Sequence, residues 1–268
     1  MNRAYLEFFE SAERKRRWNV FDDIPWEKLD RSKLSAMKGV CVETYCAEEL
    51  YLPDYTMGGV ELTREVFGLA WFQACWSYEE SKHGLVFREY LNRSGLRSSA
   101  ELAALEDSVA AKRWELPFTT YRQMSCYGAL QEAATYLAYK AQKDRAALEG
   151  DLVLEAIFKY VSRDEAAHAG FYRTVVEIEL DEDRAGTLLD LARVIAHFKM
   201  PGDGLIPNYQ ERLRISGAGI STRSFVQHGL LPMLRTLGTS RAELSAATAM
   251  LPAAEPVTVV ADSAAHAI

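Results

Sequence analysis

The stretch SYEESKHGLVF, residues 77–87, places two glutamates and a histidine inside a run that otherwise has the composition of a buried helix. Within it, Glu80 and His83 are three residues apart, and residues at that spacing share one face of an α-helix. A carboxylate and an imidazole on one face can bind the same metal ion. One such pair is weak evidence, because ordinary residue frequencies produce it by chance and a solvated helix face explains it.

The same spacing occurs a second time, in SRDEAAHAGFY, residues 162–172. Here Glu165 and His168 are again flanked by apolar and aromatic residues, and the sequence contains no third Glu-x-x-His pattern. Two helices with this motif supply four of the six ligands of a carboxylate-bridged dinuclear metal site in a helical bundle. In such a site, two further helices contribute one glutamate each.

Candidate glutamates for the two remaining helices are present. Glu132 is the only acid in residues 116–143 and lies in the apolar stretch GALQEAATYLAY, where an unpartnered carboxylate would be costly. An earlier helical stretch offers Glu43, Glu48 and Glu49. The sequence therefore predicts Glu132 as a ligand and leaves a choice among the three earlier acids.

The intervals along the chain favour Glu49. It precedes the first Glu-x-x-His motif by 31 residues, and Glu132 precedes the second by 33, which predicts two similar helix pairs. Glu48 stays the alternative. The predicted metal ligands are Glu49, Glu80, His83, Glu132, Glu165 and His168. Four carboxylates and two imidazoles, without thiolate, suit two iron or manganese ions.

Helical periodicity dominates the chain, and convincing strand alternation is absent. We expect helices over residues 3–17, 31–52, 61–91, 117–147, 151–179, 183–199, 207–215, 221–237 and 240–250. Pro53 should end or kink the second of these. Long helices with short connections pack as an antiparallel bundle, so the predicted fold class is all-α. We expect one domain over residues 1–251 and a flexible tail over 252–268, where the helical pattern is lost.

Composition excludes several classes of function. The chain has 268 residues, 49% of them hydrophobic, and a net charge of −7, which argues against general nucleic-acid binding. The sequence has no run of 18 apolar residues, so no membrane span is predicted. The N-terminus is charged and amphipathic, which differs from a signal peptide. The four cysteines form no Cys-x-x-Cys pair and are expected to be reduced. We therefore expect a cytoplasmic protein.

Four motifs resemble those of the soluble acyl-carrier-protein desaturases, the stearoyl-ACP desaturase family of ferritin-like di-iron proteins. The family's ExxLP, EENRHG, QERAT and DExRH signatures are similar to ELYLP (49–53), EESKHG (79–84), QEAAT (131–135) and DEAAH (164–168). The resemblance covers roughly residues 40–237, and its proline, matched by Pro53, favours Glu49 over Glu48. It implies a ferritin-like bundle with a four-helix di-iron core, flanking helices and the six ligands above.

The resemblance also implies an activity. It is O₂-dependent desaturation of an acyl chain on an acyl carrier protein, with two electrons from a ferredoxin-like donor and a homodimeric enzyme. Thr135 matches a threonine beside the metals, and Trp76 and Tyr172 match aromatics near the iron site and in electron delivery. Asp164 is a candidate partner for a ligand histidine. Each also has a plainer explanation, as a packing threonine, core aromatics and a surface acid.

Carrier proteins are acidic, so a basic docking patch is expected despite the net charge of −7. ERKRRW, residues 13–18, is one candidate, and Arg88, Arg93 and Arg97 form another. A charge run is more often a solvated face.

The sequence departs from the family at Ser81-Lys82, where the family has Asn-Arg, and at Ala166-Ala167. These changes leave the substrate and the redox partner open. A di-iron hydroxylase or N-oxygenase acting on a carrier-bound natural-product intermediate fits the same ligands. An iron-storage ferroxidase, a radical-generating reductase subunit and a metal-free bundle are further alternatives.

Overall fold

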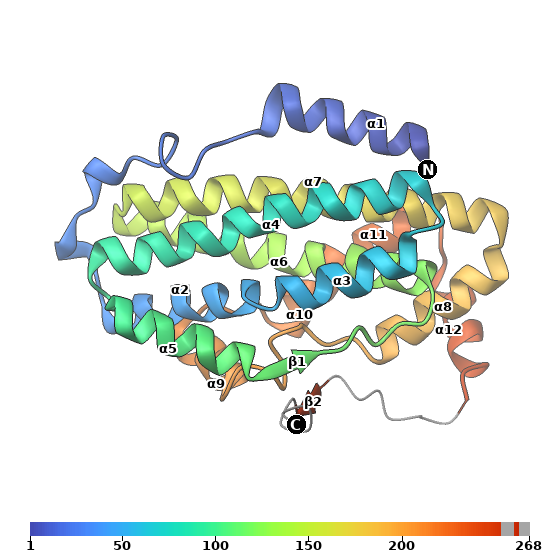
Figure 1. Cartoon of the computed structure of the whole chain (residues 1–268). Helices are drawn as coiled ribbons and strands as arrows, with labels where there is room; N and C mark the ends of the chain where they lie inside the picture. Colours follow the sequence, from blue (N-terminus) through green and yellow to red (C-terminus); the bar gives the residue numbers. More distant parts are fainter. Residues whose placement is uncertain (253–259, 263–268) are drawn as a thin grey trace, which may run out of the picture.

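The computed structural model describes residues 1–252 and 260–262 and is built around four long helices (Figure 1). These are α2 (Ala36–Glu49), α4 (Phe67–Ser94), α6 (Tyr121–Glu149) and α7 (Leu152–Glu182). The helices α6 and α7 pack along each other, and α4 packs against α2 and α7. The predicted all-α class is confirmed.

Polar contacts fix the turn between α6 and α7. Gly150 ends α6 in the left-handed conformation, with φ of 70°, which glycine adopts without steric cost. Asp151 then accepts a hydrogen bond from the backbone N–H of Leu154 and caps α7. The same carboxylate accepts from Lys38 Nζ and Tyr90 OH, each at 2.8 Å. One acid therefore holds the ends of α2, α4 and α7 together.

Two helices differ from the sequence prediction. The helix before Pro53 ends as expected, with α2 stopping at Glu49, but Pro53 then lies in the first turn of a new helix, α3 (Leu52–Thr63), where its missing N–H is tolerated. The predicted start at residue 61 is therefore wrong, and a break at residues 64–66 separates α3 from α4. A second helix, α5 (Ser99–Ala110), was not predicted. It begins at a capping box in which Ser98 and Glu101 bond each other's backbone N–H groups.

The remaining elements surround the four long helices. In Figure 1, α1 (Asn2–Ser11) lies above α4 and α7 and leads into the π turn η1 (Ala12–Arg16). Short helical turns follow at η2 (Trp26–Lys28) and η3 (Arg31–Lys33). The C-terminal part contains α8 (Arg184–Ala196), α9 (Tyr209–Ser216), α10 (Thr222–Phe225), η4 (Val226–Leu230), α11 (Leu231–Thr236) and α12 (Arg241–Ala249).

Two short strands are present although none was predicted. Strand β1 (Lys112–Trp114) pairs antiparallel with β2 (Val260–Asp262). Strand β2 falls within 252–268, the stretch predicted to be a flexible tail; most of that stretch lies outside the described residues. Among the described residues, no helix is long and apolar enough to cross a membrane.

The hydrophobic core has two parts, which lie at opposite ends of the long helices. One contains Phe72 of α4 and Tyr172 of α7, and the other contains Phe87 of α4 and Phe158 of α7. Along both helices, the Glu-x-x-His motifs fall between these parts. A buried polar layer therefore separates two apolar ones, and the apolar layers shield it from water.

Candidate metal centre

Six side chains from four helices converge in the polar layer. They are Glu49 from α2, Glu80 and His83 from α4, Glu132 from α6, and Glu165 and His168 from α7. They form two groups, in each of which the candidate ligand atoms lie within 4.8 Å of one another. Glu80 and Glu165 belong to both groups, whereas each histidine belongs to one. This is the arrangement of two bridging carboxylates between two metal positions.

Unpaired polar atoms test whether these residues fit metal ions. Glu80 Oε1, Glu132 Oε2, Glu165 Oε1 and His168 Nδ1 are buried and have no hydrogen-bond partner among the described residues. His168 Nδ1 lies 2.9 Å from Glu80 Oε1 and 3.5 Å from Glu132 Oε2 without forming a hydrogen bond. Each unsatisfied group costs about 1–3 kcal/mol, and cations between them would remove that cost. The residues fit a dinuclear iron or manganese centre.

Protonation in the cluster is strongly shifted. Burial raises the pKa of Glu132 well above its usual range, and the charge of Glu165 raises it further. Burial opposes the charged form of His83 and His168, but the surrounding carboxylates raise the pKa of both imidazoles well above the usual value. The cluster therefore holds protons when no metal is bound, and a metal ion must displace them.

The second nitrogen of each histidine contacts an acid outside the cluster. His168 Nε2 lies 2.7 Å from Glu79 Oε2, and His83 Nε2 lies 3.4 Å from Asp164 Oδ2. The pattern is crossed, because Glu79 belongs to α4 and holds the histidine of α7, whereas Asp164 belongs to α7 and holds the histidine of α4. These contacts orient the rings with Nδ1 toward the cluster. Asp164 lies at the predicted position, and Glu79 is buried rather than solvent-facing.

The N-terminal segment supplies the counter-charge of these two acids. Arg16 Nη1 lies 2.9 Å from Asp164 Oδ1 and 3.3 Å from Glu79 Oε2, and Trp18 Nε1 donates to Asp164 Oδ2 at 2.6 Å. Burial would raise the pKa of Asp164. The hydrogen bond from His83, the charge of His83 and other partners outweigh burial and lower the pKa of Asp164 to about 2. The sequence predicted Asp164 as a partner of a ligand histidine, but not its contacts with Arg16 and Trp18.

The structure reduces the charge that both candidate docking patches can offer. In ERKRRW, Arg16 is buried and Arg17 pairs with Glu79, so neither is available to a carrier protein. The second patch is neutralised: its three arginines each pair with a glutamate of this chain. These pairs are Arg88 with Glu106, Arg93 with Glu89 and Arg97 with Glu43.

The other predicted site residues lie at different distances from the cluster. Trp76 Nε1 donates to Glu132 Oε1 at 3.0 Å, so it contacts a candidate ligand directly. Tyr172 is buried, and its hydroxyl accepts from Gln73 Nε2 at 2.8 Å. Among the described contacts, Tyr172 has no hydrogen bond to a candidate ligand, whereas Trp18 reaches His83 through Asp164.

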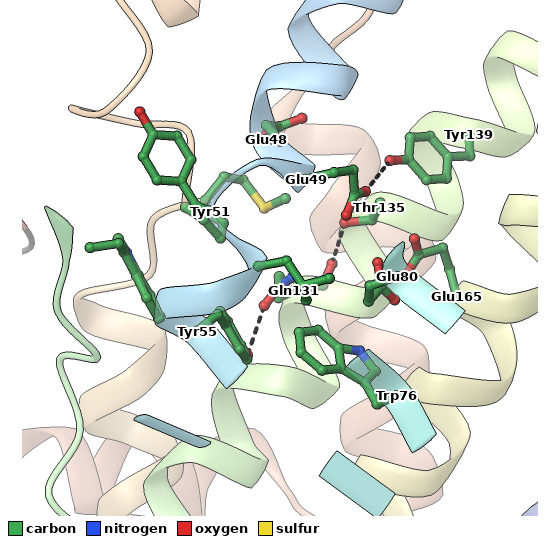
Figure 2. Close-up of a pocket in the computed structure, with 14 residues that line it drawn as sticks. Glu48, Glu49, Tyr51, Tyr55, Trp76, Glu80, Gln131, Thr135, Tyr139 and Glu165 are labelled. Atoms are coloured by element: carbon green, nitrogen blue, oxygen red, sulfur yellow. Dashed lines mark hydrogen bonds between the residues drawn. The ribbon is translucent and has the colours of Figure 1, made fainter. Parts of the chain in front are cut away.

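A small cavity of about 50 Å³ opens beside the cluster (Figure 2). Glu49, Glu80 and Glu165 line it together with Thr135, whose hydroxyl donates to the Gln131 carbonyl at 3.1 Å. In Figure 2 the hydroxyl of Tyr139 is directed at Glu49, to which it donates at 3.1 Å. We call this space the metal-side cavity.

A larger cavity of about 410 Å³ adjoins it, which we call the apolar cavity. Its lining is mostly apolar and includes Leu130, Ala134, Ile195, Phe198, Leu213 and Phe225. The two cavities share Glu48, Thr135 and Met200. These three residues mark the boundary where the two cavities meet, which we call the passage.

The three acids on α2 have separate roles. Glu49 belongs to the cluster, whereas Glu43 pairs with Arg97 and Arg212. Glu48 lies outside the cluster and accepts a hydrogen bond from Tyr209 OH. Burial raises the pKa of Glu48 to about 7, although the Tyr209 hydrogen bond opposes the shift.

Comparison with known proteins agrees with this geometry. A family model described as fatty acid desaturase matches residues 27–214. The chain belongs to this family. The resemblance inferred from the four motifs is thereby confirmed. The candidate metal centre therefore lies in a member of a family of oxidoreductases.

Relatives with curated descriptions point the same way. A putative acyl-[acyl-carrier-protein] desaturase, DesA1 of Mycobacterium tuberculosis, is 24% identical over 241 residues, covering 81% of this chain and 70% of the relative. Acyl-[acyl-carrier-protein] desaturase 4 of Oryza sativa is 30% identical over 175 residues. That match covers 61% of this chain and 41% of the rice protein.

Solved structures show the fold. The putative acyl-ACP desaturase DesA2 of Mycobacterium tuberculosis matches with a TM-score of 0.65 at 17% identity, covering 91% of this chain and 95% of the other. An R2-like ligand-binding oxidase of Sulfolobus acidocaldarius matches with a TM-score of 0.54 at 11% identity, covering 90% and 93%. The predicted ferritin-like bundle is confirmed.

Proposed function

We propose that this desaturase-family chain is an O₂-dependent di-iron oxidase that desaturates an acyl chain carried on an acyl carrier protein. Two electrons would come from a ferredoxin-like donor, and the setting would be cytoplasmic. The observation that carries the proposal is the position of the six-residue cluster beside an apolar cavity of about 410 Å³. The acyl-carrier-protein desaturases among the relatives support the substrate class.

In this proposal two iron ions would be held by Glu49, Glu80, His83, Glu132, Glu165 and His168, of which Glu80 and Glu165 belong to both groups of candidate ligands. When bound, the two ions supply the activation of O₂. The apolar cavity holds the chain by burying its methylene groups and excluding water. Glu79 and Asp164 keep the imidazoles in the orientation needed for binding. Manganese in one or both positions fits the same ligands.

Unpaired cations suggest where a carrier protein would dock. Arg193, His197 and Lys199 are exposed and line a third cavity of about 50 Å³. Within the described part of the chain, no salt bridge of these side chains is found. Met200 lines all three cavities, so this basic cluster lies beside the route to the candidate metal centre. An acidic carrier with a phosphorylated prosthetic arm has matching charge.

A homodimer is part of the proposal, because the family resemblance implies one. Exposed aromatic residues mark a candidate interface on one stripe of α4. They are Phe67, Trp71 and Tyr78, each more than half exposed. Solution mass measured by light scattering tests this point: a Trp71→Lys variant should become monomeric, and an unchanged mass would exclude this stripe.

Product analysis tests the activity. Reduced, iron-loaded protein is incubated with ¹⁸O₂ and a panel of acyl chains on carrier protein, and the products are analysed by mass spectrometry. A product that has lost two hydrogens and gained no ¹⁸O supports desaturation. Incorporation of ¹⁸O favours the hydroxylase or N-oxygenase alternative, and iron loading far above two ions per chain favours storage.

A further inference from the structure

The passage between the two cavities contains one carboxylate that the proposed function does not use. Glu48, Thr135 and Met200 line both cavities. The Thr135 hydroxyl already donates to a backbone carbonyl of its own helix, and Met200 is apolar. Any chain that extends from the apolar cavity toward the metal-side cavity therefore passes Glu48.

The Glu48 carboxylate is held in place and only partly satisfied. Its Oε1 accepts from Tyr209 OH, whereas Oε2 has no hydrogen-bond partner among the described residues. The loop at Gly202 packs tightly on this pair, because a Cβ there would lie 2.6 Å from the Tyr209 ring and 3.0 Å from Glu48 Oε1. The free oxygen is therefore a fixed acceptor in the wall of the passage.

A plain methylene chain is a poor match for this wall. It would remove water from Glu48 Oε2 and offer no hydrogen bond in exchange, which is unfavourable for a half-buried carboxyl group. An ionised carboxylate accepts from a hydroxyl or an ammonium group on the chain, and a neutral carboxyl can still pair with a hydroxyl, which both donates and accepts. Asp203 also lines the apolar cavity, but it does not line the metal-side cavity, so Glu48 is the acid closer to the reaction.

We infer that Glu48 is a specificity-determining residue whose free oxygen binds a hydroxyl or amine group on the acyl chain, close to the carbon that reacts. The substrate would then be a functionalised chain rather than a saturated hydrocarbon chain. The inference rests on the proposed function, because it places an acyl chain in the apolar cavity.

Binding to the Fe(II)-loaded protein under anaerobic conditions tests this without turnover. The fluorescent fatty acid cis-parinaric acid is displaced by dodecanoic acid and by positional series of hydroxydodecanoic and aminododecanoic acids, and iron content is measured on the same samples. At least one donor-bearing acid should bind about tenfold more tightly than dodecanoic acid, as expected for a hydrogen bond to a carboxyl group. The ratio should fall to about one in Glu48→Leu and persist in Asp203→Leu, because Asp203 does not line the metal-side cavity.

Glu48→Gln separates the two donors and serves if Glu48→Leu does not fold. The amide keeps an acceptor but loses the charge, so a preference for the hydroxyl survives and a preference for the ammonium is lost. The inference is overturned if no donor-bearing acid binds better than dodecanoic acid, if the ratio is unchanged in both Glu48 variants, or if Asp203→Leu abolishes it equally. Failure of every acid and of the probe to bind would instead overturn the acyl-chain proposal itself.

Discussion

The buried arginine of the N-terminal segment allows a sharp test of the layer outside the cluster. Arg16 is 8% exposed and is the cation that touches both Glu79 and Asp164. Replacing it by methionine keeps the apolar stem but leaves two buried carboxylates with less compensation. Arg17 still pairs with Glu79, so Asp164 loses more.

The expected effect is large. Breaking a buried ion pair by removing one partner costs about 3–5 kcal/mol. For a chain of this size, 1 kcal/mol corresponds to a shift of about 2 °C in melting temperature, so Arg16→Met should lower it by about 6–10 °C. Arg14 is the matched control in the same basic run, because its side chain is 72% exposed and, among the described residues, its one salt bridge is to exposed Glu10. Arg14→Met should change stability by less than about 0.5 kcal/mol.

Thermal unfolding of the two variants and the parent protein, all metal-free, measures the difference by circular dichroism. Urea unfolding of the same samples checks that the free energy, and not the unfolding mechanism, has changed. If the two variants melt within about 1 °C of each other, the buried network around Arg16 does not hold the acids and the explanation is wrong.

Further predictions concern metal binding and docking. Asp164→Asn keeps the shape but weakens the support of His83, so metal affinity measured by dialysis should fall about 10–100-fold, whereas exposed Asp144→Asn should not change it. Both cluster histidines have pKa values raised above the usual range, so Fe(II) binding must release their protons; affinity should rise with pH, and a pH indicator in weak buffer should report proton release at pH 7. Equal affinity at pH 6 and pH 8 would contradict this. Lys199→Glu should raise KM for a carrier-bound chain about tenfold at low salt with kcat unchanged, whereas Arg14→Glu should leave both constants unchanged.

The ligand residues of the cluster could be predicted from the sequence, because each Glu-x-x-His pair is set by the geometry of a single helix turn. The i, i+3 spacing brings Glu80 and His83 to one face wherever the helix packs, and Pro53 distinguished Glu49 from Glu48. The structure brings the six predicted ligands together.

The contact of Arg16 with Asp164, outside the cluster, could not be predicted from the sequence in this way. Arg16 and Asp164 are separated by 148 positions, and no periodicity relates them. The same holds for Arg88 and Arg97, whose glutamate partners lie on α5 and α2, whereas Arg93 pairs with Glu89 one turn away on its own helix. Helix α5 is different, because its capping box, Ser98 with Glu101, was present in the sequence and should have indicated a helix start.

The central claim is that the six side chains hold two metal ions, and Glu132 tests it most directly. Its carboxylate is buried, and one of its oxygens has no hydrogen-bond partner among the described residues. Glu132→Ala removes an unfavourable buried acid from the metal-free protein and removes a ligand from the loaded one.

Iron per chain and melting temperature, measured for both proteins with and without Fe(II), give the result. The parent protein should bind two ions and become more stable when loaded; Glu132→Ala should bind fewer and gain little from iron, although its metal-free form is at least as stable as the parent. Equal iron content in the two proteins, or no iron in the parent, would contradict the account.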